Sequence, residues 1–315
     1  SSIKPEDAPD SKGGTCNGGA LFIMDADGGN IRCVASNTDC SVHVGCFPIW
    51  VDNETLIYHA NGHSYLTNIN SGTSEEIAGL RARDLHPDGR KLACQYADPK
   101  KKGVVIVDLK DFSRQEIVTS ESLLEIMLDT FNRDERMPDF NCCDESDLAN
   151  IKWSPDGSHG LLRFNFRPGD YMKSLFVFKE DGSGLKRLDS VSPYFCHHSW
   201  HPDGERILYC DKNEMGDGRV YYILDKDGYN REVLSKTQIG DHPKFNPQGT
   251  EIVDFGDGYI WHFVPETGEI RKLASYSNNF NPGLHAHPSW SRDGRQIMYH
   301  SDHTGTSQIY IIPLH

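Results

Sequence analysis

A turn phrase that recurs about every 45 residues constrains the fold of this 315-residue chain most strongly. The phrase starts with an aromatic or apolar residue, continues with Pro-Asp-Gly or a close variant, and ends in a β-rich run. Proline sets φ at the first turn position and glycine takes the positive φ at its close, so each copy predicts a β-hairpin. The copies are LHPDGRKLACQYA (85–97), WSPDGSHGLLRFN (153–165), WHPDGERILYCDK (200–212), the looser FNPQGTEIVDFG (245–256) and WSRDGRQIMYHSD (290–302), and the degenerate WVDNETLIYHA (50–60).

A second hairpin with a glycine-containing turn is predicted after each copy of the first. Examples are residues 174–188, 219–234 and 259–273. Each unit therefore predicts four strands, and a unit of this size cannot bury both faces of its sheet unless copies stack. Four-stranded repeats of this period indicate an all-β fold, a β-propeller of four-stranded blades. We expect one β-propeller domain over 1–315, with an irregular N-terminal segment at 1–19.

The number of blades follows from the copies of the first hairpin. Six copies predict six repeat units, and seven blades would follow if the N-terminal region formed a further one. The run ALFIMDADGGNIRCVAS (20–36) resembles an isolated second hairpin, which suits ring closure by N-terminal sequence. The spacing between the copies at 85 and 153 is longer than the others. The surplus contains SESLLEIMLDTFNRDERM (120–137), whose apolar spacing predicts one short helix near 121–135 with Ser120 as its cap.

Histidines recur at one position in three consecutive units. The residues three positions before the aromatic or apolar residue of each turn are Ala82, Asn150, His197, His242 and His287. The first strand of a propeller blade lines the central channel, so these three imidazoles should converge near the channel mouth. His285 lies two residues before His287 and shares its face if this stretch is a strand. Converging imidazoles suit a divalent transition metal such as Mn, Zn, Ni or Fe, whereas a single imidazole is better explained by a hydrogen bond to a carbonyl or to water.

Other polar side chains are weaker candidates. His198 should point away from His197 and pack, and His86 and His201 lie in predicted turns, where we expect them to be solvated. Arg163 and Arg167 precede His197 by one blade and would either reach a carboxylated substrate or lie on the surface. The sequence has no GxSxG serine-hydrolase motif, no P-loop and no GxGxxG.

Composition limits the partners and the compartment. The net charge of −14 argues against nucleic acid, and no apolar run is long enough to cross a membrane. Nine cysteines without a CxxC pair favour disulfides over a zinc ribbon. The start of the chain without Met and the sequon Asn53-Glu54-Thr55 favour a secreted, extracellular protein, with the periplasm as the alternative.

Three segments resemble the oligogalacturonate lyases, propeller enzymes with TolB-like repeats. HAHPSWSRDGRQIMYHSDHTGTSQIYII (285–312) is similar to that family's C-terminal His-x-His-Pro-Ser segment. DHPKFNPQGTEIVDFGDGYI (241–260) and HHSWHPDGERILY (197–209) resemble the two preceding blades. The likeness is specific over about 190–315 and extends only to the repeat pattern before that.

The resemblance implies a manganese ion bound by histidines matching His242, His285 and His287. The family has a glutamine ligand just upstream of the His-x-His pair. This chain has NPGL there, so that ligand is either missing or replaced by Asn281. A histidine matching His197 would be the catalytic base.

The implied activity is lysis of a 4-linked uronic-acid glycan, an oligosaccharide or polysaccharide, by metal-assisted β-elimination. A metal or an arginine such as Arg167 would stabilise the charge that develops on the substrate carboxylate while a neutral histidine removes the C5 proton. The implied partner is an acidic saccharide, either a pectin fragment or another uronic-acid polymer, with no nucleic acid and no membrane. Two alternatives stay open: a non-catalytic TolB-like propeller that binds protein, and a propeller glycoside hydrolase.

Overall fold

The computed structural model describes residues 15–41, 45–132, 147–166, 172–188, 191, 195, 197–212, 219–235, 237, 239–240, 242–279 and 285–314. The chain packs into two compact units, Ser1–Met137 and Pro138–His315, and each is described by itself. The single domain over 1–315 stays a prediction. A strand already begins at Thr15, so the structure differs from the prediction of an irregular segment through residue 19.

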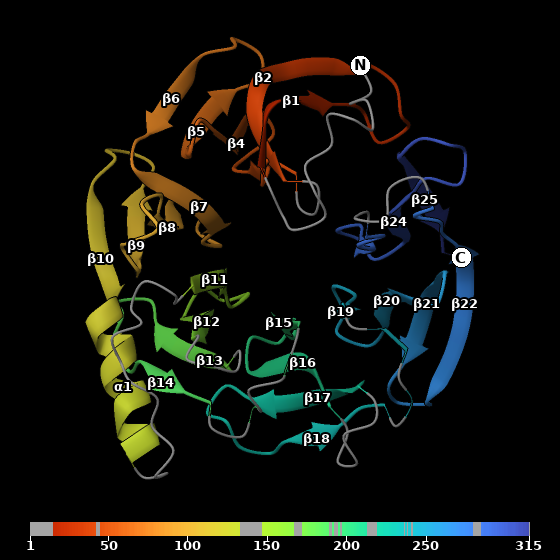
Figure 1. Ribbon diagram of the computed structural model, residues 1–315. Coiled ribbons are helices and arrows are strands. Elements are labelled where there is room, and N and C mark those ends of the chain that lie inside the picture. Colours follow the sequence, from red (N-terminus) through yellow and green to blue (C-terminus); the bar gives the residue numbers. More distant parts are fainter. Residues whose placement is uncertain are drawn as a thin grey trace. The chain divides into compact units, whose positions relative to one another are not determined.

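The first unit contains a hairpin, two four-stranded antiparallel sheets and a helix (Figure 1). The hairpin pairs β1 (Thr15–Ile23) with β2 (Arg32–Ser41). The first sheet has the order β3 (Ile49–Trp50), β4 (Thr55–Ala60), β5 (His63–Asn68) and β6 (Ser74–Ile77). The second has β7 (Leu80–Leu85), β8 (Lys91–Tyr96), β9 (Gly103–Asp108) and β10 (Arg114–Thr119).

The second unit contains four antiparallel sheets whose strands follow one another in chain order (Figure 1). The first two are β11 (Asp147–Trp153), β12 (His159–Phe166), β13 (Met172–Lys179), β14 (Lys186–Arg187), and β15 (His198–Trp200), β16 (Arg206–Lys212), β17 (Arg219–Asp225), β18 (Glu232–Val233). The last two are β19 (Lys244–Phe245), β20 (Ile252–Gly256), β21 (Tyr259–Val264), β22 (Glu269–Ser275), and the three-stranded β23 (Ser289–Trp290), β24 (Gln296–Ser301), β25 (Gln308–Pro313).

The repeated turns form as the sequence predicts. The six copies of the phrase join β3 to β4, β7 to β8, β11 to β12, β15 to β16, β19 to β20 and β23 to β24. In the five copies that contain it, the turn glycine has a φ between 70° and 76°, which a side chain would strain. The hairpin expected at 20–36 is also present as β1 and β2.

The predicted helix is α1 (Ser120–Asn132), which contacts β10. Its cap differs from the prediction. Thr119, not Ser120, is the N-cap, because the Ser122 backbone N–H donates to Thr119 Oγ1 at 3.1 Å and the Thr119 N–H donates to Ser122 Oγ at 3.2 Å. This reciprocal pair satisfies two backbone donors that the first turn would leave unpaired.

Stacking between neighbouring sheets of the second unit forms its core. Leu161 and Val177 of one sheet pack with Trp200 and Tyr209 of the next, and similar clusters join the second sheet to the third and the third to the fourth. Two indoles link first strands across these interfaces: Trp200 Nε1 donates to the Lys152 carbonyl at 3.1 Å, and Trp290 Nε1 to the Lys244 carbonyl at 3.0 Å. These links fix the ends of the first strands relative to each other.

Two turn histidines differ from the expectation of solvated side chains. His86 and His201 are both buried. Each ring accepts a backbone N–H within its own turn through Nδ1, and His201 Nε2 also contacts the Gly249 carbonyl at 3.0 Å. They therefore hold turns together.

The cysteines give no support to the predicted disulfides. Of the four cysteines whose side chains are described, Cys33 and Cys94 are free thiols. The backbone pairing of β1 with β2 places Cys16 opposite Cys40, but their side chains are not described. Secretion stays a prediction. Among the described residues, no helix has the length and apolar character that a membrane span needs.

Candidate metal centre

The site histidines lie just before the first strands of their sheets. His242 precedes β19 by two residues, and His285 and His287 precede β23. The prediction that His285 and His287 share one face of a strand is therefore wrong, because residues 285–288 do not form a strand. His287 has a φ of 41°, which is unusual for a non-glycine residue, and Pro288 follows it.

The three imidazoles nevertheless meet. One ring nitrogen from each of His242, His285 and His287 lies within 4.8 Å of the others. The rings of His285 and His287 stack at 5.4 Å with an interplanar angle of 22°. The His242 ring stands nearly perpendicular to both, at 82° and 84°. Three imidazole nitrogens that converge in this way are a donor set that divalent transition metals accept, so the residues fit the group that the sequence predicts.

Two residues of β20 support this cluster. The ring of Phe255 is buried and lies 4.8 Å from His242, 5.6 Å from His285 and 5.8 Å from His287. The carboxylate of Asp254 is buried and accepts the His242 backbone N–H at 3.0 and 3.1 Å. It also accepts the Tyr221 hydroxyl at 2.6 Å and the Phe255 N–H at 2.6 Å. Asp254 thus fixes the backbone that carries His242.

Neither Asp254 nor Phe255 belongs to a repeated sequence pattern that would mark it as part of the site. The sequence feature that could have identified Asp254 is an acidic residue inside the apolar run IVDFG. In the structure every residue of this run but the last is buried. A buried carboxylate requires hydrogen-bond donors, and its neighbours here belong to the segment of His242.

His197 lies against the cluster without being part of it. Its ring stacks on that of His242 with centroids 3.5 Å apart and an interplanar angle of 28°. Its Nδ1 is buried and has no hydrogen bond to the described residues. His198 is buried and its ring packs against that of Phe195, so the expected packing role is observed. Burial, followed by the charge of Arg163, lowers the pKa of His198 well below its usual value, so this ring is neutral.

Of the arginine and asparagine candidates, the structure describes only Arg163. Arg167 and Asn281 lie outside the described residues, so their predicted roles stay predictions. Arg163 lies on β12, partly buried and close enough to His198 to influence its ionisation.

Lysines occupy the first strands beyond the histidines. Lys244 lies two residues after His242 and donates to Ser289 Oγ at 3.0 Å. Burial, aided by the charge of Lys152, lowers the pKa of Lys244 to about 8.

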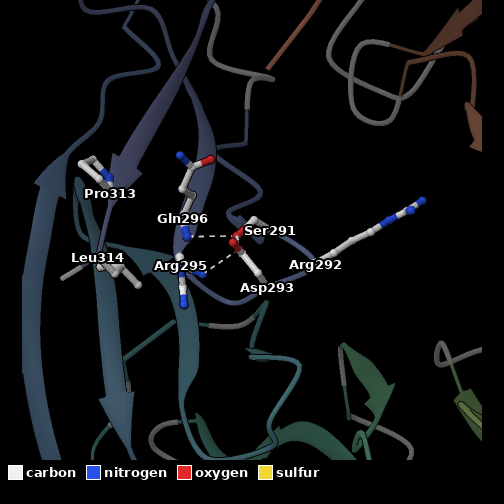
Figure 2. A pocket seen from close by; sticks show the side chains of 7 residues that line it. All are labelled: Ser291, Arg292, Asp293, Arg295, Gln296, Pro313 and Leu314. Carbon is white, nitrogen blue, oxygen red and sulfur yellow. Dashed lines mark hydrogen bonds between the residues drawn. The ribbon is translucent and has the colours of Figure 1, made fainter. Parts of the chain in front are cut away.

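A surface hollow lies elsewhere in the second unit (Figure 2). It is lined by Ser291, Arg292, Asp293, Arg295, Gln296, Pro313 and Leu314. Asp293 accepts the Ser291 hydroxyl at 2.6 Å and the Arg295 N–H at 3.0 Å, which stabilises the turn. None of the histidines of the cluster lines this hollow, so we do not assign it to the site.

Comparisons with known proteins place these observations in context. No family model matches the chain. The oligogalacturonide lyase of Pectobacterium atrosepticum and the oligogalacturonate lyase of Dickeya dadantii are each 21% identical to it over 162 residues. Each match covers 44% of this chain and 42% of the relative, so the chain matches less than half the length of these curated relatives.

Solved structures match over more of the chain. An oligogalacturonate lyase in complex with manganese has a TM-score of 0.73 at 17% identity, covering 97% of this chain and 87% of that one. An oligogalacturonate lyase from Vibrio parahaemolyticus has a TM-score of 0.69 at 15% identity, covering 93% and 82%. The predicted fold is confirmed. The chain is a β-propeller that resembles the oligogalacturonate lyases.

Proposed function

We propose that this protein is a lyase that cleaves a 4-linked uronic-acid glycan by β-elimination. The observation that carries the proposal is the convergence of His242, His285 and His287 on one point, with the His197 ring stacked against them. The names of the relatives, which are lyases of oligogalacturonate, support the same class of substrate.

The cluster would hold a divalent metal through its three imidazoles, and Asn281 or water would complete the ligands. Manganese is the proposed ion because the lyase structure that matches most of this chain contains it. When bound, the ion would supply Lewis-acid stabilisation of the negative charge that develops at the substrate carboxylate.

His197 is the proposed base. An imidazole accepts protons efficiently near neutral pH. The His197 ring comes from the neighbouring sheet and lies beside the histidine cluster that would hold the metal. It would remove the proton at C5, the electron pair of that C–H bond would form the C4–C5 double bond, and the C4–O bond would break. The departing oxygen would then take a proton. Arg167 is proposed to pair with the substrate carboxylate.

The proposed partner is an acidic oligosaccharide or polysaccharide, and the proposed location is extracellular or periplasmic. A polymer of this kind would meet an enzyme with a net charge of −14, so its binding would depend on local cationic groups.

The test is an assay of metal content and of cleavage on the same preparation. Oligogalacturonate and other uronic-acid oligosaccharides are incubated with the manganese-loaded protein, and unsaturated product is followed by its ultraviolet absorbance. We expect unsaturated product from the wild type. His197→Ala should reduce the rate by about 10²- to 10⁴-fold, because a positioned base contributes that much, and should keep its metal. His303→Ala, an exposed histidine of the same unit, is the matched control.

Other results would change the assignment. Loss of metal from His197→Ala would make His197 a ligand and require another base. Saturated products from the wild type would favour a glycoside hydrolase. Binding of a protein without any cleavage of uronic-acid substrates would favour the TolB-like alternative.

A further inference from the structure

A row of polar side chains follows the histidines along the first strands of the second unit. Lys152, Ser199, Lys244 and Ser289 each stand one residue before the aromatic residue of their turn, in four consecutive sheets. Ser199 and Lys244 come two residues after His197 and His242. Two residues of extended chain span about 7 Å, so this row lies close to the histidine cluster but is distinct from it.

The two lysines concentrate positive charge here. Lys152 is close enough to Lys244 for the two ammonium groups to repel each other. Among the described residues, neither ammonium has a carboxylate within 4.0 Å, and the printed contact of Lys244 is its hydrogen bond to Ser289 at 3.0 Å. Asp254 attracts Lys244 at longer range, but its oxygens already accept hydrogen bonds from Tyr221, His242 and Phe255.

Ser199 supplies a second, independent observation. It lies on β15, between the strands that carry Lys152 and Lys244, and its Oγ is buried without a hydrogen-bond partner among the described residues. A buried hydroxyl that makes no hydrogen bond is costly and is uncommon unless something outside the protein binds it. Partly buried cations without a paired anion are costly for the same reason.

The backbone holds this row in place. Trp200 Nε1 donates to the carbonyl of Lys152 and Trp290 Nε1 to that of Lys244, so each lysine is linked to the neighbouring sheet. A binding site built on linked strands loses little conformational freedom when its ligand arrives.

We propose that Lys152, Ser199 and Lys244 form a carboxylate-binding site that receives the acidic group of a second uronic-acid residue of the substrate. The identity of this ligand rests on the proposed function, in which the histidine cluster takes the first carboxylate. Each residue of a uronic-acid oligosaccharide carries one carboxylate, so two neighbouring sugars require two such sites. Lys152 and Lys244 provide local positive charge on a protein whose negative net charge would otherwise repel an acidic substrate.

The test is binding of galacturonate, measured by calorimetry near pH 7 in the manganese-loaded protein and again after chelation, where no metal competes for the carboxylate. Lys152→Met and Lys244→Met should each weaken binding about tenfold, and the double variant more, because each removes a charged hydrogen bond. Ser199→Ala should have a smaller effect. Lys179→Met, an exposed lysine of the same unit, is the matched control. Galacturonate methyl ester, which has no charge, should bind weakly and equally to all variants.

Folding is checked by thermal melting. Removing a partly buried, poorly paired charge should leave the melting temperature of Lys244→Met equal to or above that of the wild type. Lys244→Gln, which can still donate to Ser289, replaces it if the Met variant does not fold. Loss of binding in a folded protein that melts no lower supports a ligand-binding role and not a structural one.

The outcomes separate this site from the proposed activity. Equal galacturonate binding by wild type and double variant, or no binding by the wild type in either state, overturns the site. Lysine-dependent binding without any unsaturated product keeps the site and overturns the lyase. Cleavage by a wild type whose lysine variants bind normally keeps the lyase and overturns the site.

Discussion

His287 has an unusual backbone for a residue that precedes proline. Its φ of 41° lies in the left-handed region, which costs non-glycine residues about 1–3 kcal/mol when it is adopted. Such strain persists where surrounding structure holds it, and it concentrates at functional sites. In this conformation the His287 ring stacks on that of His285 and stands 4.9 Å from that of His242.

We predict that His287→Ala loses the bound metal. Removing outer partners of metal ligands already weakens affinity about 10- to 100-fold, so loss of a ligand should cost at least about 100-fold. Elemental analysis of protein purified with manganese measures the effect, and His303→Ala should keep a full complement. A full metal content in His287→Ala would show that the centre lies elsewhere.

His59 gives a second prediction at the residue scale, in the first unit. Burial, followed by the charge of Arg83, lowers its pKa to about 4 from 6.5. Its Nε2 lies 3.0 Å from the carbonyl of Ala82. The unfolded chain therefore binds a proton at higher pH than the folded one. The stability from His59 is fully present above pH 6.5 and is lost as the pH falls through 4, by up to about 3 kcal/mol.

Denaturant unfolding at pH 7 and pH 4 tests whether the free energy of unfolding falls with pH as predicted. His59→Gln should show a smaller loss of unfolding free energy between the two pH values than the wild type. His63→Gln, on the same hairpin but much more exposed, is the matched control. An equal pH dependence in His59→Gln would assign the acid sensitivity to other groups.

Among the elements, β20 connects the packing of its sheet to the candidate centre. One end of the strand packs against the neighbouring sheets, while Asp254 and Phe255 hold the segment of His242. The acidic side chain therefore acts through the backbone of another segment, as a positioning residue.

We predict that Asp254→Asn weakens both stability and metal affinity. The amide nitrogen cannot accept the hydrogen bonds that Asp254 receives, so buried donors lose partners at a cost of about 2–4 kcal/mol. Tyr221→Phe removes one donor and should cost about 1 kcal/mol while keeping the metal. Asp293→Asn, in an exposed turn, is the control. Unchanged metal affinity in a folded Asp254→Asn would remove the positioning role.

On the scale of the molecule, the proposed metal ligands come from two sheets of the second unit. His242 belongs to the sheet that starts with β19, and His285 and His287 to the one that starts with β23. An ion bound by all three should therefore stabilise the fold as well as the site. Binding to the folded state at 100 times the dissociation constant stabilises by about 2.7 kcal/mol.

We predict that manganese raises the melting temperature by about 4 °C. The unfolding entropy is about 2.1 cal/mol/K per residue, so each kcal/mol shifts the melting temperature of a 315-residue chain by about 1.5 °C. Chelation should reverse the shift, and His287→Ala should show none. A shift of equal size in His287→Ala would place the stabilising ion at another site.

The sequence by itself determined the repeat and therefore the fold. Turn chemistry is local: proline and glycine set φ within each copy of the phrase, and the hairpins follow wherever the phrase occurs. The repeat also predicts that His197, His242 and His287 lie near each other, because they occupy the same position in three consecutive repeats that stack side by side. Their rings are in contact in the structure.

Only the tertiary structure decided how these side chains meet. The left-handed backbone of His287, the buried hydrogen bonds of Asp254 and the indole links to Lys152 and Lys244 join segments far apart in the chain. The turn pattern predicts solvated side chains for His86 and His201, and this prediction is wrong because a local turn sequence does not specify which residues pack over it. The burial of a side chain and its hydrogen-bond partners depend on the neighbouring sheets. The local sequence of one sheet does not specify which residues of the next sheet contact it.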